Sequence, residues 1–289
     1  MRIDLLLLMY NRPEHTLSTL EGLAVNGVEH VKAYLDYSDK PEVIENQKRI
    51  LDIVHNFKGL NITLTQRTEK FGLAKSVRTA MSDAFADGAD AAILLEDDCV
   101  LRPGGYEFFR QGLTELKDNK KIRSLCGYLF PNCNFIFDPE ADLLLLNRFS
   151  TWGWATWADR WQQYEVDLAK VVALFDTIGF SIEDFSSDMA ILSKSEKFLK
   201  GQVDIWSVSW ILLHYLTSTF AVYPKEAVIE NIGLDGSGAN CEDTEVFKAG
   251  SANSVINQYN WKGLNYFLEN EEIIKDFMAI NGLKTYPKP

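Results

Sequence analysis

Three adjacent carboxylates, Glu96-Asp97-Asp98, follow directly on the apolar run 92–95. Neighbouring carboxylates repel one another and resist burial, so a purely structural element gains little from them. At the carboxyl end of a strand in an α/β sheet, side chains face the crevice where ligands bind. A hard cation such as Mg²⁺ or Mn²⁺ takes carboxylate and phosphate oxygens, so it could hold the acids and a diphosphate together. The alternative is a solvated acidic turn.

Successive side chains on a strand point to opposite faces, so the three acids cannot contact one ion equally. We expect one carboxylate to bind the cation and the other two to reach hydroxyl groups of the ligand.

The elements that must position this triplet alternate between strand and helix through the first half of the chain. Apolar and β-rich runs predict strands at 3–10, 31–37, 61–67, 92–95 and 122–129. Helical spacing, with Pro and Gly at the ends, predicts helices from Pro13 to before Gly27, at 41–57, at 73–86 and from after Gly105 to about 117. This βαβ order predicts an α/β fold with a mostly parallel sheet and right-handed crossovers.

The second half of the chain has a different rhythm. Aromatic residues and turn formers fill 131–165, and a Gly-rich loop occupies 232–242. Apolar periodicity predicts helices at 182–200 and 205–217 and a helical tail at 258–281. With no repeat or low-complexity linker, this half is expected to complete the first rather than to form a separate domain.

Composition excludes several classes of protein. The 289 residues include 46% hydrophobic ones and carry a net charge of −12, which argues against a general nucleic-acid binder and against docking on an anionic membrane. The four cysteines lack metal-type spacing and are expected to be reduced and mostly buried. The apolar start lacks a basic region and a cleavage site, and no apolar run is long enough to span a bilayer. We therefore expect a cytoplasmic location.

Six short motifs follow one another between residues 3 and 243: Tyr10-Asn11-Arg12-Pro13, Gly72-Leu73-Ala74-Lys75-Ser76, Leu95-Glu96-Asp97-Asp98, Gly127-Tyr128, Ser150-Thr151-Trp152-Gly153-Trp154-Ala155-Thr156-Trp157, and Asn231-Ile232-Gly233-Leu234-Asp235-Gly236-Ser237-Gly238. In this order they resemble the GT-A-type glycosyltransferases, of the family 2-like group related to N-acetylglucosaminyltransferase I. The resemblance implies a Rossmann-like GT-A domain over 1–245, with a nucleotide-binding half (1–130) and an acceptor half (131–245). Residues 246–289 would form a helical C-terminal extension.

The resemblance also implies roles for the acids and for the turn after the first strand. Asp98 would coordinate the cation that bridges the nucleotide diphosphate, with Asp97 near the ribose and Glu96 near the donor sugar. The base and ribose would be held by the Tyr10-Asn11-Arg12 turn and by the acid after the second strand, Asp36 or Asp39. The family often has Asn before Gly-Leu-Ala, where this chain has Phe71.

Basic and aromatic residues supply further candidates. Lys75 and Arg78 stand one turn apart on a predicted helix, where they would neutralise phosphate or remain solvated; Arg67 is a similar case. Gly153-Trp154 resembles the family's sugar-pocket pair, whereas tryptophans 157 and 161 are expected in the core. His214, within an apolar stretch, is expected to be a core histidine. Residues 235–241 would form either a lid over the donor or a plain surface turn.

The attack of a sugar hydroxyl benefits from a general base. Asp204 precedes an apolar helix and resembles the acidic residue of inverting relatives; the alternative role is the N-cap of that helix. Asp159 and Asp184 are weaker candidates.

The leading hypothesis is a metal-dependent glycosyltransferase that uses a nucleotide-diphosphate sugar. Mn²⁺ or Mg²⁺ on Asp98 would stabilise the leaving diphosphate, and Asp204 would act as base with inversion at the anomeric carbon; retention of configuration is the alternative outcome. By analogy with the family, the acceptor would be a glycan or glycolipid in surface glycan synthesis. One alternative is a sugar-phosphate nucleotidyltransferase, although 10–14 is not the Gly-rich basic loop that such an enzyme needs. Another is a non-catalytic glycan- or nucleotide-binding protein.

Overall fold

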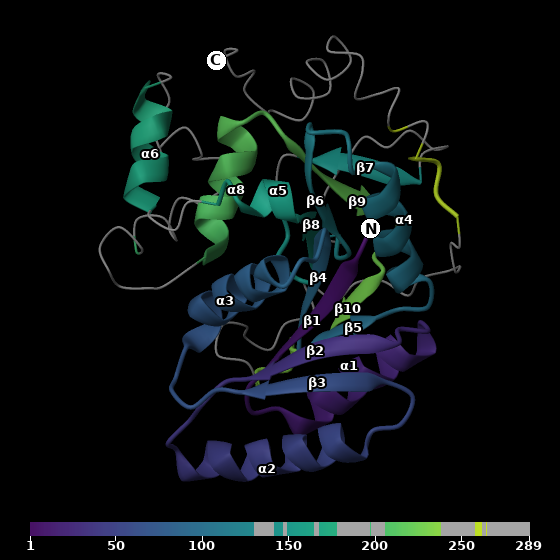
Figure 1. Ribbon diagram of the computed structural model, residues 1–289, viewed down its shortest axis with the longest axis vertical. Helices are drawn as coiled ribbons and strands as arrows, with labels where there is room; N and C mark the ends of the chain where they lie inside the picture. Colours follow the sequence, from purple (N-terminus) through teal and green to yellow (C-terminus); the bar gives the residue numbers. More distant parts are fainter. Residues whose placement is uncertain are drawn as a thin grey trace.

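The fold is α/β, with a large mixed β-sheet flanked by helices (Figure 1). The computed structural model describes residues 1–129, 142–146, 149–164, 168–177, 197, 206–237, 258–261 and 264. Its main sheet has eight strands in the order β3-β2-β1-β4-β8-β6-β9-β7. The strands that lead to the acidic triplet all run parallel: β1 (Ile3–Met9), β2 (His30–Leu35), β3 (Asn61–Gln66) and β4 (Ala91–Glu96).

Three crossover helices join these strands: α1 (Pro13–Val25), α2 (Pro41–Asn56) and α3 (Gly72–Ala86). Proline opens both α1 and α2, at a position where its missing N–H would lack an intrahelical partner anyway. The predicted βαβ order of residues 3–129 is confirmed, with element ends shifted by a few residues.

The order β3-β2-β1-β4 creates a topological switch point between β1 and β4. The chain leaves β1 toward β2 on one side and returns from β3 to β4 on the other. Leu8 pairs with Glu96 across the two strands, so the turn at 10–12 and the acidic triplet emerge side by side. In open α/β sheets, this crevice at the carboxyl ends is where ligands bind.

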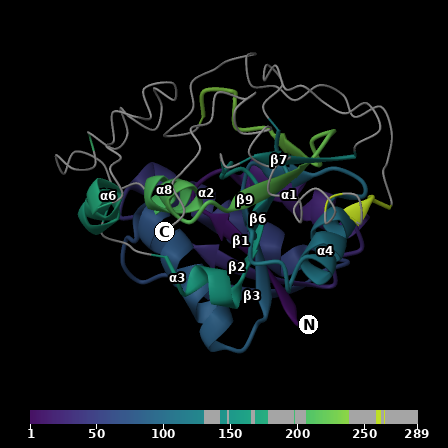
Figure 2. The ribbon, with the colours of Figure 1, turned by 90° about the horizontal axis from the view of Figure 1, so that it is seen from above.

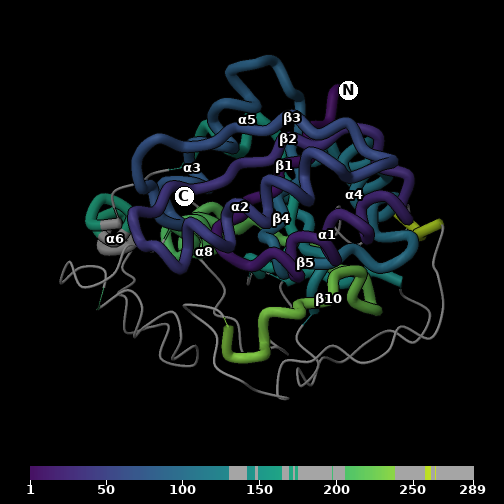
Figure 3. The backbone as a smooth tube through the Cα atoms, turned by 90° about the horizontal axis from the view of Figure 1, so that it is seen from below, coloured from purple at the N-terminus to yellow at the C-terminus, as the bar shows by residue number. Residues whose placement is uncertain are grey.

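The elements after the acidic triplet complete the sheet, mostly with antiparallel pairs. They include α4 (Gly105–Glu115), β6 (Ile122–Cys126), β7 (Leu143–Leu146), β8 (Trp154–Trp157), α5 (Ala158–Trp161), α6 (Leu168–Thr177), α8 (Trp206–Leu216) and β9 (Phe220–Pro224). β8 is antiparallel to β4 and β6, and β7 is antiparallel to β9. A separate ribbon pairs β5 (Cys99–Leu101) with β10 (Ile229–Asn231), seen side by side in Figure 3. The sequence did not predict this ribbon or strands β7 to β9.

The core lies on both faces of the sheet. Figures 1 and 2 show α3 and α8 on one side of the strands and α4 on the other. The side facing α3 and α8 contains Met81, Trp154 and Trp210, and the opposite side contains Phe108 and Phe109. No helix of the described residues is long and apolar enough to cross a bilayer.

Several residues predicted for the core lie there. Cys99 and Cys126 are buried free thiols, and the other two cysteines lie outside the described residues. His214 is fully buried, with Nε2 3.0 Å from the Ser124 hydroxyl. Tryptophans 157 and 161 are also buried.

The predicted C-terminal extension is described only at residues 258–261 and 264. Here Tyr259 and Trp261 pack on Phe108 of α4, with ring centroids 5.3 and 5.8 Å away. The predicted helix at 182–200 lies outside the described residues apart from 197, so that expectation stays a prediction.

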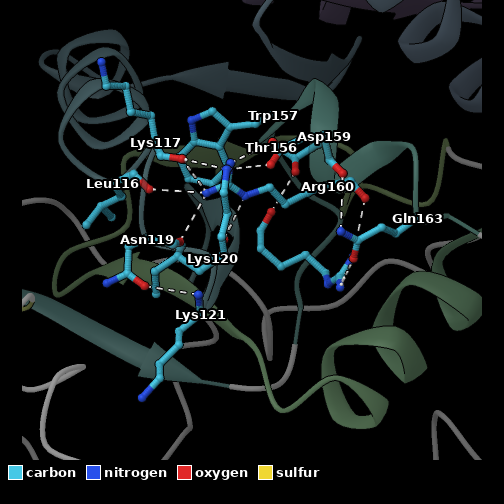
Figure 4. Close-up of polar contacts among 12 residues, drawn as sticks. Leu116, Lys117, Asn119, Lys120, Lys121, Thr156, Trp157, Asp159, Arg160 and Gln163 are labelled. Carbon is cyan, nitrogen blue, oxygen red and sulfur yellow. Dashed lines mark hydrogen bonds and ion pairs between the residues drawn. The ribbon is translucent and has the colours of Figure 1, made fainter.

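A buried arginine ties α4 to the sheet (Figure 4). Arg160 is 3% exposed, and its guanidinium donates to the carbonyl oxygens of Lys117 and Asn119 at 2.8 and 3.2 Å. It lies 4.2 Å from the Trp157 ring centroid and 2.7 Å from Asp159 Oδ1. Arg160 therefore satisfies carbonyls just beyond the helix end, where intrahelical partners run out. Asp159, a candidate base, is also bound to Lys120 at 2.6 Å.

Replacing Arg160 should destabilise the fold strongly. Arg160→Met leaves several carbonyls and Asp159 without this donor, so we expect a loss of about 2–4 kcal/mol in the free energy of unfolding. Arg49, 52% exposed and paired with Glu14, is the matched control, and Arg49→Met should cost less than about 1 kcal/mol. Urea denaturation measures both values. Equal losses in the two variants would contradict this role.

Candidate functional site

The acidic triplet meets a single arginine across the switch point. Arg12, just after β1, forms ion pairs through Nη2 with Asp97 Oδ1 and with Asp98 Oδ2, the latter at 2.9 Å. All three side chains are largely buried, with exposures of 15% for Arg12, 5% for Asp97 and 11% for Asp98. One guanidinium thus bridges two adjacent carboxylates that would otherwise repel each other.

Backbone and hydroxyl contacts fix the two aspartates. The Tyr10 amide donates to Asp97 Oδ2 at 3.3 Å, and the Thr19 hydroxyl of α1 donates to the Asp97 carbonyl at 2.9 Å. The Ile232 amide, just after β10, donates to the Asp98 carbonyl at 2.9 Å. The turn after β1, helix α1 and the β10 segment therefore converge on the end of β4.

Burial and mutual repulsion change the acidity of this cluster. Burial, reinforced by the charges of Asp98 and Asp97, raises the pKa of Glu96 to about 8. Burial also raises the pKa of Asp97 to about 6, although Arg12 opposes the shift. Burial disfavours the charged form of Arg12, but Asp97 and Asp98 outweigh it, and the pKa of Arg12 rises above its ordinary value. The site concentrates negative charge more strongly than one arginine neutralises it.

Gly233 lies against the Asp98 carboxylate. A Cβ at this position would lie 2.1 Å from Asp98 Oδ2 and 2.8 Å from Arg12 Nη1. The Gly233 amide donates to Asn231 Oδ1 at 2.8 Å, which shapes the turn. The absence of a side chain at 233 thus lets the backbone after β10 cover the ion pair.

The next part of that segment reaches α1. His15 Nε2 lies 3.2 Å from Asp235 Oδ2, while Asp235 Oδ1 accepts hydrogen bonds from the amide and hydroxyl of Ser237. These contacts involve the start of the predicted lid at 235–241, whose remaining residues lie outside the described part of the chain. Its role as a lid stays a prediction.

Asp36 lies at the carboxyl end of β2, where its side chain binds backbone. Oδ1 accepts from the Phe71 amide at 2.9 Å, and Oδ2 accepts from the Gly72 amide at 2.8 Å. Asp36 thereby links β2 to the start of α3. The Gln47 side chain joins the same edge by donating to the carbonyls of Tyr10 and Asp36. Asp39 is exposed, and a ribose contact by either acid stays a prediction.

Two cations flank the Phe71 ring beside this edge. Lys75 Nζ lies 3.8 Å from the ring centroid and 2.9 Å from Glu69 Oε1. The Arg67 guanidinium carbon lies 4.5 Å from the same centroid, and its Nε and Nη2 are buried without a hydrogen-bond partner. Arg67 therefore keeps hydrogen-bond donors that a bound anion could use. Arg78 is partly buried on α3.

Gly153 and Trp154 are predicted to line a sugar pocket, but the Trp154 side chain is fully buried. Gly153 has φ +66°, and a Cβ there would lie 2.5 Å from Ile229 Cγ1, so only glycine fits. Trp154 is fully buried on β8 and stacks on Trp206 at 5.1 Å. The Trp154 ring thus packs in the core on the α8 side, and its Nε1 has no hydrogen-bond partner. Contact with a sugar stays a prediction.

Asn11 and three unpredicted site residues can also be placed, whereas two candidate bases cannot. Asp204 and Asp184 lie outside the described residues. Asn11 is partly exposed in the turn between β1 and α1. Thr19, His15 and Gly233 belong to the site but were not singled out as site residues. For Gly233 the only signal was its place in the Gly-rich motif, since its partner is far away in sequence.

The oxygen atoms at this site suit a hard cation whose remaining ligands come from a bound phosphate and water. Among the described residues, no three acidic, histidine or cysteine side chains converge on one point. Asp98 Oδ1 lies 3.5 Å from the Cys99 thiol, a weak donor, so this oxygen keeps capacity for a cation. Mg²⁺ commonly takes one or two carboxylates, with phosphate oxygens and water as its other ligands. Asp98 fits such a site.

A depression of about 240 Å³ elsewhere on the surface does not belong to this site. Glu29, Gly59, Leu60 and Asn61 line it, next to the amino ends of β2 and β3. The acids lie at the opposite, carboxyl ends of the parallel strands, where chemistry in such folds occurs.

Comparisons with known proteins give structural similarity only. No protein-family model and no curated protein matches the chain. Mannosyltransferase PcManGT from Pyrobaculum calidifontis, in complex with GDP-Man and Mn²⁺, is 13% identical, with a TM-score of 0.39, over 62% of this chain and 46% of that one. S. aureus TarS 1-349 is 11% identical, with a TM-score of 0.44, over 79% and 60% of the two chains.

A third structure matches over almost its full length. A putative nucleotide-diphospho-sugar transferase from Desulfovibrio desulfuricans G20 is 10% identical, with a TM-score of 0.39, over 96% of this chain and 99% of that one. By contrast, this chain spans less than two thirds of the length of PcManGT and of TarS 1-349. At such identities and TM-scores, these similarities assign neither a family nor an activity.

A methyl group at position 233 should disturb the ion pair. Because its Cβ would overlap Asp98 Oδ2, Gly233→Ala is expected to lower the free energy of unfolding by about 1–3 kcal/mol. Ser237→Ala, in the same segment, should cost much less. In a double-mutant cycle, Asp98→Ala should relieve much of the Gly233→Ala effect, because it removes the overlapping carboxylate. Additive losses in urea denaturation would place the strain elsewhere.

The raised pKa of Glu96 should appear as a pH dependence of stability. The folded protein holds this proton up to a pKa of about 8, against 4.5 for the ordinary carboxyl, so stability falls as pH rises through this window. In EDTA, the wild type should lose stability relative to Glu96→Gln from pH about 5 to about 8. Urea denaturation at several pH values tests this, and parallel profiles for the two proteins would refute it.

Proposed function

We propose that the protein is a metal-dependent glycosyltransferase that moves a sugar from a nucleotide-diphosphate donor to an acceptor hydroxyl. The observation that carries the proposal is the position of the Asp97–Asp98–Arg12 cluster at the switch point between β1 and β4. A buried acidic pair at this place weakens the fold unless a ligand uses it, and α/β sheets bind ligands there.

Residues at the carboxyl edge of the sheet would contact different parts of the nucleotide-sugar donor. Asp98, with an oxygen that only a thiol approaches at 3.5 Å, would hold Mn²⁺ or Mg²⁺. When bound, the cation supplies Lewis-acid stabilisation of the departing diphosphate. Arg12 lies beside Asp98 and can add a second positive charge to that leaving group. Arg67 would be a further anion contact at the end of β3, since among the described residues its buried Nε and Nη2 have no hydrogen-bond partner and Nη2 has only the distant Asp83 carboxylate at 3.9 Å.

The other acids would recognise hydroxyl groups. Glu96 would approach the donor sugar, where its carboxyl oxygens can accept hydrogen bonds from sugar hydroxyl groups. Asp97 would approach the ribose, together with the turn at Tyr10 and Asn11. Asp204 is proposed as the base that takes the acceptor proton, with inversion at the anomeric carbon. The acceptor would be a glycan or glycolipid of the cell surface, and the protein would act in the cytoplasm.

The motif order along 10–238 resembles that of the group related to N-acetylglucosaminyltransferase I, and this resemblance favours transfer over the synthesis of nucleotide sugars. The turn at 10–13 supports the same choice, because it offers one bridging arginine where a nucleotidyltransferase needs a Gly-rich phosphate loop.

Incubation with a panel of nucleotide sugars and Mn²⁺ tests the proposal. We expect slow release of one nucleoside diphosphate with the free sugar, accelerated by an acceptor glycan and abolished by EDTA. Asp98→Asn should lower the rate by at least about 100-fold, because leaving-group stabilisation is lost. Asp204→Asn should abolish transfer while leaving donor binding intact.

Glu45→Gln, at an exposed acid paired with Lys48 on α2, is the matched control and should keep the wild-type rate. Full activity in EDTA or in Asp98→Asn would contradict the metal role. Pyrophosphate release from a nucleoside triphosphate and a sugar phosphate would show a nucleotidyltransferase instead. Saccharide or nucleotide binding with no turnover of any donor would show a binding protein.

A further inference from the structure

Arg12 lies between the two aspartates of the triplet. Its Nη2 contacts both Asp97 Oδ1 and Asp98 Oδ2, so one positive charge is shared by two carboxylates and offsets only part of their negative charge. The backbone at Gly233 lies against Asp98 and Arg12, since a Cβ there would lie 2.1 Å from Asp98 Oδ2 and 2.8 Å from Arg12 Nη1. Arg12 and the backbone at Gly233 therefore both contact the Asp98 carboxylate.

We propose that Arg12 is an internal counter-ion that competes with the divalent cation for Asp98 and yields this carboxylate only when a nucleoside diphosphate arrives with the metal. The proposal rests on the proposed function, because it concerns the same metal and donor. It makes Arg12 a positioning residue that couples metal binding to nucleotide binding.

The contacts distinguish which aspartate is exchanged. Asp97 is 5% exposed, and its second oxygen also accepts from the Tyr10 amide, so two separate donors hold this carboxylate. Asp98 is 11% exposed, and within the described part of the chain the hydrogen-bond donor that faces its second oxygen is the weak thiol of Cys99. Asp98 is therefore the carboxylate that can turn toward a metal while Asp97 retains Arg12.

Charge explains why the exchange needs a diphosphate. A divalent cation placed on Asp98 alone lies next to the Arg12 guanidinium, and the two positive charges repel each other in a poorly solvated site. A diphosphate brings negative oxygens that both cations can share, so repulsion is replaced by attraction to a common anion. Metal and nucleotide are thus expected to bind with positive coupling, which is reciprocal by thermodynamic necessity.

Mn²⁺ titration without nucleotide tests this competition. Electron paramagnetic resonance of free Mn²⁺ gives the dissociation constant for the wild type, Arg12→Gln, Arg12→Lys and Arg49→Gln. We expect Arg12→Gln to bind Mn²⁺ at least about tenfold more tightly than the wild type, because a repelling charge is gone. Arg12→Lys keeps the charge and should bind as weakly as the wild type. Arg49→Gln, which changes the net charge equally but away from the acids, should leave the constant unchanged.

The same titration with UDP, GDP, ADP or CDP completes the test. The nucleoside diphosphate that binds should tighten Mn²⁺ binding by the wild type, and this gain should shrink in Arg12→Gln. Unchanged or weaker Mn²⁺ binding by Arg12→Gln would overturn the inference. So would an equal gain from nucleotide in both proteins.

A second measurement serves if Arg12→Gln does not fold. The Arg12 side-chain Nε–H signal in NMR spectra of the wild type, assigned by its loss in Arg12→Lys, should shift with Mg²⁺ and the diphosphate together but not with Mg²⁺ alone. A signal that stays fixed under saturation with both would overturn the inference. If neither Mn²⁺ nor any nucleoside diphosphate binds, singly or together, the proposed function itself fails; if they bind without dependence on Arg12, only this inference fails.

Discussion

The repulsion among carboxylates at the end of β4 is the constraint around which the site is built. The triplet lies where β4 ends, and burial raises the pKa values of Glu96 and Asp97. Arg12 is brought to them because β1 and β4 are neighbours with a fixed parallel register. The βαβ order of the first half thus places Arg12 beside acidic residues that follow it by more than eighty positions in the sequence.

The second half of the chain closes this cluster from the side. β5 follows the triplet directly and pairs with β10. This pairing places Gly233, just after β10, next to the Asp98 carboxylate. The backbone there can approach an ion pair because no side chain intervenes. The contact from Asp235 to His15 then joins the same segment to α1. A site assembled from β1, β4, α1 and β10 depends on long-range pairing, so a change in any one element reaches the acids.

The sequence predicts the first half of the fold well, because parallel strands buried on both faces read as continuous apolar runs, as in β1 and β4. It also points to the acidic triplet and the turn at Arg12. It does not reveal that Asp36 binds the start of α3 or that Trp154 is buried, because both outcomes depend on packing partners distant in sequence. The short strands β5 and β10 have no periodic signal, and three residues are too few to give one.

In the proposed function, Asp98 would hold a cation that also binds the diphosphate of a nucleotide. Pulsed electron paramagnetic resonance of bound Mn²⁺ with a nucleoside diphosphate tests this most directly, since phosphorus in the first coordination sphere gives a measurable hyperfine coupling. The account predicts phosphorus coupling in the wild type and loss of the bound Mn²⁺–nucleotide signal in Asp98→Asn. Bound Mn²⁺ without phosphorus coupling, or an identical spectrum in Asp98→Asn, would contradict it.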